Sequence, residues 1–345
     1  DMFNLADSGA LEDLAPYLEN SQTLKREDFL ESVLKAYEID DRLVTIPVSF
    51  TMRSLFAKER LVGAEAGWTL EEMMALKEEY PESLFISHLN RELALRMCLE
   101  YGWESFVDEE TGECFFDSEE FIRVLKFAQS FGPWGGFEQE PYEALQKDEM
   151  IIVDEGIHSV ENYQMVRLLI EEPSTVIGYP SADGTPITVI SGGDTYAIAT
   201  RSDNKEGAWK FMESVLAEEN MRKSYYSFST RVNLLEEMFA KAMEKEYETD
   251  AAGNVLYDEA GEPIEKIKYT WGYGDWTAEI YAATEEEINE LRQMIANVHL
   301  EGGRSQTIIN IVREEAGAYF TGQKSAEEVA EIIQSRVEIY VNENS

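Results

Sequence analysis

Helical and strand-like segments alternate along the chain, and this alternation limits the fold more than any other feature of the sequence. Residues 29–36 and 205–216 have apolar side chains at helical spacing, whereas residues 43–50 and 150–153 are short apolar runs typical of buried strands. No segment rich in Pro, Gly or Ser separates the 345 residues into successive domains. The pattern predicts an α/β protein of two lobes, with a chain that crosses between the lobes several times.

Capping residues mark where several helices begin. Thr69 is followed three residues later by Glu72, and Ser325 is followed by Glu328. In such a capping box each side chain bonds the backbone N–H of the other residue, which satisfies donors that the first helical turn leaves free. Residues 284–341 are expected to continue as three helices.

A turn signal occurs twice, eight residues apart, as Asp-Ala-Ala-Gly at 250–253 and Asp-Glu-Ala-Gly at 258–261. This spacing predicts a short antiparallel meander, with Gly at the positive-φ position of each turn. Residues 248–259 also match part of an EF-hand calcium loop, but Ala252 stands where that loop has a ligand. We therefore favour hairpin turns over a calcium site.

The charge of the chain excludes several classes of function. Asp and Glu number 69 against 29 Lys and Arg, which gives a net charge of −40 at pH 7. Such a surface repels phosphate backbones, and no basic patch offsets it, so we expect no nucleic-acid partner. The longest run without a formal charge, residues 127–137, is shorter than the ~20 residues of a membrane-spanning helix.

Metal and cofactor motifs are missing from the sequence. His88, His158 and His299 lie far apart, and neither a zinc motif nor a phosphate-binding glycine loop occurs, so we expect no metal and no cofactor. The cysteines are Cys98, in an apolar helical stretch, and Cys114. A disulfide between them is one interpretation, but a chain of this size does not need one, and we favour two buried free thiols.

Aromatic side chains beside glycine-rich turns are the best sign of a ligand. Trp134 lies in Gly-Pro-Trp-Gly-Gly, Tyr196 follows Gly192-Gly193, and residues 271–276 contain two Trp and one Tyr. Flat rings stack on the C–H faces of sugars, while nearby carboxylates and guanidinium groups bind the hydroxyls. The alternative is that these rings anchor their loops, and we favour that alternative for residues 271–276.

Segments in the same order along nearly the whole chain carry a family resemblance: Gly9–Leu18, Gly67–Glu72, Gly193–Thr200, Asn204–Phe211 and Glu314–Tyr340. Together they resemble the extracellular solute-binding proteins of bacterial ABC importers, in the carbohydrate-type branch known as family 1. The resemblance implies a two-lobe periplasmic-binding-protein-like (Venus flytrap) fold of type II. It also implies opening strands before residue 1, so we expect the first lobe to be incomplete at its N-terminus.

The same resemblance predicts the lobe boundaries. We expect residues 1–52 and 193–232 in the first lobe. We expect residues 53–192 and 233–345 in the second lobe, with a hairpin insertion at 248–277.

Ligand-binding positions follow from the resemblance, residue by residue. They lie on the crossing strand, after the strand at 150–153, on the returning hinge and near the last helices: Phe50, Arg53, Glu155, His158, Asp194, Tyr196, Arg231 and Arg304. Trp134 joins them as an aromatic side chain in a glycine-rich loop. The alternative at each of the strongest four, Phe50, Glu155, Tyr196 and Arg231, is a packing or salt-bridge role.

The resemblance implies a receptor rather than an enzyme. Such a protein captures a small solute between its lobes, here a sugar or oligosaccharide, and delivers it to ABC transporter permease subunits. We expect it to be extracellular, anchored as a lipoprotein in its full-length form, and monomeric. The alternatives are a binding protein of the same shape for a non-sugar solute or a sensor kinase, and a glycoside-active enzyme with two carboxylates roughly 5–10 Å apart.

Overall fold

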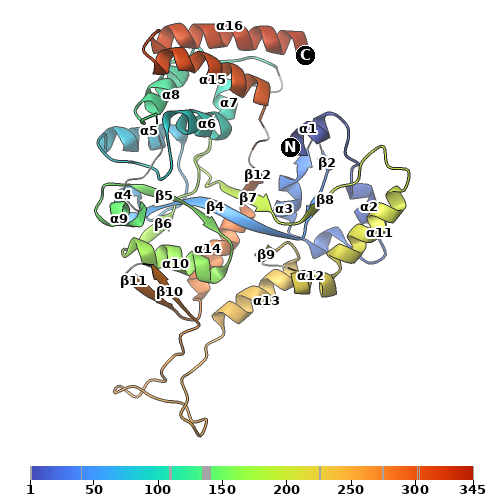
Figure 1. Cartoon of the computed structure of the whole chain (residues 1–345), viewed down its shortest axis with the longest axis vertical. Coiled ribbons are helices and arrows are strands. Elements are labelled where there is room, and N and C mark those ends of the chain that lie inside the picture. The colour runs from blue at the N-terminus through green and yellow to red at the C-terminus, as the bar shows by residue number, and fades with distance from the viewer. Residues whose placement is uncertain are drawn as a thin grey trace. The chain divides into compact units, whose positions relative to one another are not determined.

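The computed structural model describes residues 2–39, 41–108, 111–133, 141–224, 227–273, 276–300, 302 and 304–344. The chain forms two compact units (Figure 1). Unit 1 contains Asp1–Arg53, Gly156–Glu171 and Thr188–Leu300, and unit 2 contains Ser54–Glu155, Glu172–Ile187 and Glu301–Ser345. The units differ from the lobes expected above, because residues 233–300 belong to unit 1. The lobe boundaries themselves stay a prediction.

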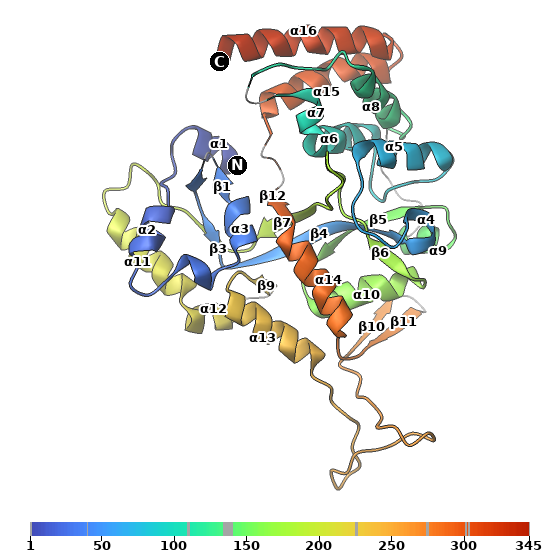
Figure 2. The ribbon, with the colours of Figure 1, turned by 180° about the vertical axis from the view of Figure 1, so that it is seen from behind.

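Unit 1 contains helices and short strands from three parts of the chain (Figures 1 and 2). Its helices are α1 (Met2–Asp7), α2 (Ala15–Asn20), α3 (Glu31–Ala36), α10 (Val160–Ile170), α11 (Lys205–Leu216), α12 (Glu218–Ser224), α13 (Val232–Met243) and α14 (Glu285–Ala296). Its strands are β1 (Glu38–Ile39), β2 (Arg42–Leu43), β3 (Ile46–Pro47), β7 (Thr188–Gly192), β8 (Thr195–Tyr196), β9 (Phe228–Ser229), β10 (Tyr269–Tyr273), β11 (Trp276–Ile280) and β12 (Val298–Leu300).

The long strand β4 (Ser49–Lys58) begins in unit 1 and ends in unit 2. In unit 1 it pairs antiparallel with β7 and with β9, so that Phe50 faces Gly192 on one side and Phe228 on the other. Strand β12 extends this sheet by pairing parallel with β7. In unit 2 the end of β4 pairs antiparallel with β6 (Ser174–Val176).

Unit 2 is mainly helical around the end of β4 and the strand β5 (Ile152–Ile157), whose last two residues belong to unit 1. Its helices are α4 (Glu59–Val62), α5 (Leu70–Glu79), α6 (Arg91–Tyr101), α7 (Trp103–Phe106), α8 (Glu119–Gln129), α9 (Pro141–Gln146), α15 (Gln306–Phe320) and α16 (Ala326–Asn344). Three fully buried rings, Phe106, Phe116 and Phe121, meet with centroids 5.0–6.0 Å apart in its core. None of the described helices is both long and apolar enough to cross a membrane.

Several predicted elements are confirmed. Helix α5 begins after Thr69, with the capping box to Glu72 in place, and α11 spans the predicted 205–216. The apolar run at 43–50 does not form one strand, because Pro47 has no N–H to donate and the run divides into parts of β2, β3 and β4. Both cysteines are buried free thiols, as favoured above.

The meander is confirmed as hairpin turns. The Asp250 carboxylate accepts hydrogen bonds from the backbone N–H of Ala252 and Asn254 and from the Asn254 amide, which closes the first turn. Gly253 and Gly261 both have φ of 86°, the left-handed conformation that each turn needs. Among the described residues, no group of three or more His, Cys, Asp or Glu side chains is placed to hold a metal ion.

Candidate functional site

Unit 1 places four predicted site residues in or next to its strands. Phe50 in β4 pairs with Gly192, at the end of β7, while the N–H of Val48 donates to the Asp194 carbonyl over 3.0 Å. Tyr196 in β8 pairs with Ile46, and β9 leads on to Arg231 from the other side of β4. Phe50 and the segment before Arg231 thus belong to the sheet around β4, whereas Tyr196 belongs to the separate two-stranded sheet of β3 and β8, with Asp194 in the link between β7 and β8.

The two glycines that precede Asp194 are required by close packing. A Cβ atom at Gly192 would lie 2.4 Å from the Tyr37 hydroxyl and 2.7 Å from Thr195 Cγ2, and one at Gly193 would lie 2.5 Å from Ser49 Oγ. Burial raises the pKa of Tyr37, and its hydroxyl lies against the Gly192 backbone. A side chain at Gly192 would therefore collide with Tyr37, Thr195 and Pro47, whereas one at Gly193 would require the Ser49 hydroxyl to move.

Two of the predicted ligand-binding side chains are occupied by contacts within unit 1. Phe50 is fully buried, with its ring centroid 5.8 Å from that of Phe228. Arg231 is 7 % exposed, donates to the Leu216 carbonyl over 3.0 Å and forms an ion pair of 3.5 Å with Asp28. Its guanidinium also lies 5.3 Å from the centroid of the Phe29 ring. These contacts match the packing and salt-bridge alternative, and a ligand role for Phe50 or Arg231 stays a prediction.

The remaining predicted residues of unit 1 are more accessible. Tyr196 is half-buried, and its ring meets Phe211 edge-on at 5.7 Å. The side chains of Arg53, Asp194 and His158 are exposed. His158 also precedes α10, where its backbone N–H donates to the Asn162 side chain. Tyr196 is therefore the predicted aromatic residue of this unit that combines a fixed ring with an accessible face.

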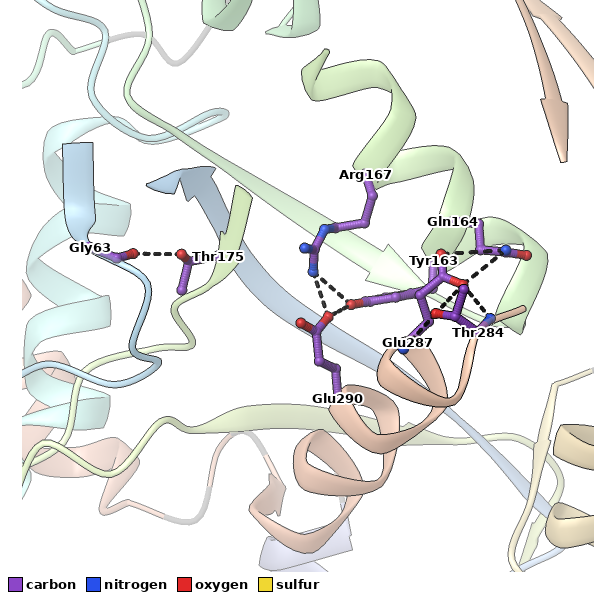
Figure 3. A network of polar contacts seen from close by, with 8 residues as sticks. All are labelled: Gly63, Tyr163, Gln164, Arg167, Thr175, Thr284, Glu287 and Glu290. Carbon is purple, nitrogen blue, oxygen red and sulfur yellow. Dashed lines mark hydrogen bonds and ion pairs between the residues drawn. The ribbon is translucent and has the colours of Figure 1, made fainter. Parts of the chain in front are cut away.

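A network of polar side chains, buried at Tyr163 and Gln164 and half-buried elsewhere, fixes α10 to α14 in the same unit (Figure 3). Tyr163, fully buried, donates to the Glu290 carboxylate, and Arg167 contacts both groups with Nη1 2.8 Å from the tyrosine oxygen and 2.5 Å from Glu290. Burial raises the pKa of Tyr163, which keeps its hydroxyl protonated as a donor. Gln164 adds weaker bonds to Glu287 at 3.3–3.4 Å. The network holds the helix that follows β5 in a defined position.

In unit 2, the predicted residue Glu155 lies next to several polar and aromatic residues that were not predicted as site residues. The preceding residue, Asp154, accepts a hydrogen bond of 2.7 Å from the Tyr179 hydroxyl, and its N–H donates to Ser87 Oγ. Tyr101 stacks on Tyr179 with centroids 4.6 Å apart and planes 18° apart. The half-buried carboxylate of Asp154 thus stands beside a stacked pair of aromatic rings, and Glu155, also half-buried, follows it in β5.

Tyr142 completes this group. Its pKa is raised, first by burial and then by the nearby negative charge of Glu155, so the phenol stays protonated. Carboxylates that accept, phenols that donate and an aromatic stack that offers a flat face are the groups that bind a polyhydroxylated ring. We call Tyr101, Tyr142, Asp154, Glu155 and Tyr179 the tyrosine–carboxylate group.

Arg304 lies elsewhere in unit 2. It forms an ion pair with Glu104, and its guanidinium carbon lies 5.9 Å from the centroid of the buried Trp103 ring. Trp134 lies outside the described residues. Tyr101 and Tyr179 each adjoin a glycine, Gly102 and Gly178, so the signal that selected Tyr196 was present for both. Their stacking joins residues 78 positions apart and depends on tertiary structure.

The fold is the two-lobe α/β fold of periplasmic binding proteins, as the comparisons with solved structures confirm. The sugar-binding protein MalE from Xanthomonas citri is similar with a TM-score of 0.58 and 14% identity over 99% of this chain and 81% of that one. An ABC substrate-binding protein from Listeria monocytogenes, in complex with cycloalternan, is similar with a TM-score of 0.55 and 13% identity, over 99% and 82%. Maltose-bound MalE3 from T. maritima is similar with a TM-score of 0.52 and 15% identity, over 96% of this chain and 81% of that one.

The family follows from the sequence comparison. The family model for bacterial extracellular solute-binding proteins matches residues 1–253. This match covers well over half of the chain, and the chain belongs to that family. A comparison with curated proteins finds no match.

Proposed function

We propose that this chain captures a saccharide outside the cell and delivers it to the permease subunits of an ABC transporter. The observation that carries the proposal is the family match over residues 1–253, because the family consists of extracellular solute-binding proteins. The saccharide is supported by the similar structures named above, which include a sugar-binding protein and complexes with cycloalternan and maltose.

The tyrosine–carboxylate group supports the same class of ligand. Sugar rings are bound by stacking on an aromatic face together with hydrogen bonds to acidic side chains, and Tyr101 is half-buried on the stacked pair. Asp154 is oriented by the Tyr179 hydroxyl and has further acceptor capacity. We propose that Tyr101, Asp154 and Glu155 contact the saccharide, and that Tyr179 positions Asp154 through its hydrogen bond.

The proposal includes the cellular setting. We propose that the full-length protein is held at the outer face of the cell by a lipid anchor, acts as a monomer and catalyses no reaction on its solute. A family of binding proteins supports the last point. A chromogenic glycoside assay checks it, with no turnover as the expected result.

Calorimetric titration with maltose, linear malto-oligosaccharides and cyclic glucans tests the function. We expect one of these saccharides to bind, and no heat from any saccharide would contradict the proposed ligand class. Asp154→Asn tests the site, because it removes a charge that accepts from Tyr179 and from ligand hydroxyls. We expect it to weaken binding about 10-fold, the value of one charge-assisted hydrogen bond.

Asp183→Asn is the matched control. It removes the same charge in unit 2, but Asp183 serves an exposed turn in which its carboxylate accepts from Ser181 and Thr185. We expect the affinity of this variant to stay within about twofold of the wild type, since no ligand contact is lost. Equal affinities for wild type and Asp154→Asn would retain the function and refute the site.

A further inference from the structure

Residues 244–268, between α13 and β10, form an arm that we call the hairpin arm. Both views of the ribbon show it extending away from α13 and from the β10–β11 hairpin of the same unit (Figures 1 and 2). The solute-binding role proposed above does not use it.

Backbone hydrogen bonds give the hairpin arm an ordered structure. Three backbone bonds of 2.9 Å join positions spaced eight residues apart, from Glu248 N–H to the Ile264 carbonyl, from Ile264 N–H to Leu256 and from Leu256 N–H back to Glu248. Asp250 and Asp258 close the two turns with the same pattern of bonds. These bonds restrict the backbone of the arm, which reduces the entropy that a partner would have to remove by ordering it.

Apolar side chains are exposed along the hairpin arm. Tyr257 is 62 % exposed. Four more large apolar residues of the arm are also exposed: Tyr247, Val255, Leu256 and Ile264. Exposed apolar residues gathered on one short segment mark an interaction surface, whereas scattered ones need no explanation. Tyrosine is also among the residues that contribute most to binding at protein interfaces.

A recess lies at the base of the arm. A cavity of about 620 Å³ is lined by the start of α10, by α13 and by both base strands of the arm, with Val160, Met238, Glu246 and Lys266 among its residues. Lys266 pairs with Glu246 at 3.1 Å, and Lys245 pairs with Glu265 at 3.4 Å. Lys245 and Lys266 are thus neutralised locally, the Lys268 ammonium donates to the carbonyls of Lys241 and Ala242, and the recess adds depth to the exposed surface.

The charge of the arm selects its partner. Residues 247–264 contain five acids and no Lys or Arg: Glu248, Asp250, Asp258, Glu259 and Glu262. An anionic lipid surface or a phosphate polymer would be repelled, and so would a second copy of a chain with net charge −40. Apolar side chains ringed by acids complement a protein surface with an apolar patch ringed by Lys and Arg.

We propose that the hairpin arm is a docking element for such a basic, apolar protein surface, on the outer side of the permease that receives the solute. This inference rests on the proposed function, since that function supplies the partner. Docking places the apolar side chains around Tyr257 against the permease, and the acids of the arm speed and orient the encounter. The interaction is expected to weaken as salt is added.

Removing the arm tests the proposal. Lys266 N–H already donates to the Glu246 carbonyl over 2.8 Å, the bond that closes a two-residue β-turn. Replacing residues 247–265 with Asn-Gly therefore joins two positions that are already paired. The probe is the permease complex in lipid nanodiscs, with affinity measured by surface plasmon resonance and ATP hydrolysis measured alongside. We expect the armless variant to bind the complex at least ~10-fold more weakly, the loss typical of one interface anchor.

Point variants separate surface chemistry from folding. Tyr257→Ser should weaken docking, and Glu259→Lys should weaken docking and reduce its salt dependence. Glu331→Lys, at an exposed position on α16 in unit 2, makes the same charge change outside the arm and should leave docking unchanged. All variants should keep the wild-type affinity for the saccharide.

The outcomes distinguish the two proposals. Equal docking by wild-type and armless chains overturns the role of the arm and leaves the proposed function intact. Light scattering checks for dimers. If the wild type forms dimers and the armless chain does not, the permease-docking role of the arm is also overturned, because the arm would then bind a second copy of this chain. A wild type that binds saccharide but does not dock on the permease overturns both the arm's partner and the delivery step.

Discussion

Lys58 is a buried cation at the end of β4, and its removal is expected to destabilise unit 2. Its side chain is 1 % exposed. Its ammonium donates to the Gln146 carbonyl over 3.1 Å and pairs with Asp148 at 2.9 Å and Glu172 at 2.8 Å. Arg60 pairs with the same two carboxylates, so four charges of alternating sign join three separate chain segments.

Lys58→Met keeps most of the stem and removes the charge. Each lost charge-assisted hydrogen bond destabilises the fold by about 1.5–3 kcal/mol. Removing the buried ammonium also relieves the fold of the cost of keeping that charge out of water, which is several kcal/mol. Asp148 and Glu172 are 47% and 37% exposed, and in the variant both still form ion pairs with Arg60. Water can therefore solvate the sides of these carboxylates that Lys58 contacted. The balance is a loss of about 2 kcal/mol in the free energy of unfolding, less than for a fully buried pair.

Urea unfolding followed by circular dichroism measures this loss. Arg60→Met is the control, because Arg60 is 46% exposed and its removal should cost no more than about 1 kcal/mol. The reasoning is wrong if Lys58→Met unfolds at the same urea concentration as the wild type, or a higher one. That result would mean that the desolvation of Lys58 cancels its hydrogen bonds.

Three further predictions concern stability and reactivity. Lys58 holds the pKa of Asp148 below its ordinary value, and Arg60 does the same for Glu172. The stabilisation that these two carboxylates contribute to the folded state is therefore complete above pH ~4.5 and is lost as the pH falls through the lowered pKa values. Melting temperatures measured from pH 7 to 3 should fall less steeply in Lys58→Met than in the wild type. Burial raises the pKa of the Cys98 thiol, so a thiol reagent at pH 8 should label it only after urea unfolds the chain, and rapid labelling of the native protein would contradict its burial. Arg231→Met should lower the free energy of unfolding by about 2 kcal/mol through the lost bond to Leu216 and the lost ion pair with Asp28, and an unchanged urea midpoint would show that these contacts add nothing to stability.

Local signals in the sequence predicted much of the fold. The capping box at Thr69 and the apolar spacing at 205–216 place α5 and α11, because these features act over a few neighbouring residues. The repeated Asp-Gly turns predicted the hairpins of the arm for the same reason. The exposure of the arm's apolar residues was not predictable, since it depends on what packs beside them.

The candidate site was predictable only in part. The family resemblance predicted Glu155, after the strand at 150–153, but it did not predict Asp154, whose partner rings Tyr101 and Tyr179 come from distant segments. Arg231 was predicted to bind the ligand, but in the structure its guanidinium already contacts other residues. It forms an ion pair with Asp28, lies over the Phe29 ring and donates to the Leu216 carbonyl. Which side chain remains accessible is decided by packing between segments, and one sequence does not contain that information.

The division of both units among separate stretches of chain has a consequence for biosynthesis. Unit 1 combines residues 1–53 with a segment that ends at Leu300, so its N-terminal part has no complete set of partners until most of the protein has been made. At ribosomal speeds of about 5–20 residues per second, the nascent chain would wait roughly ten seconds to a minute before this unit can close. Since unit 2 also includes residues 301–345, we expect neither unit to complete its packing until its last helices have been made.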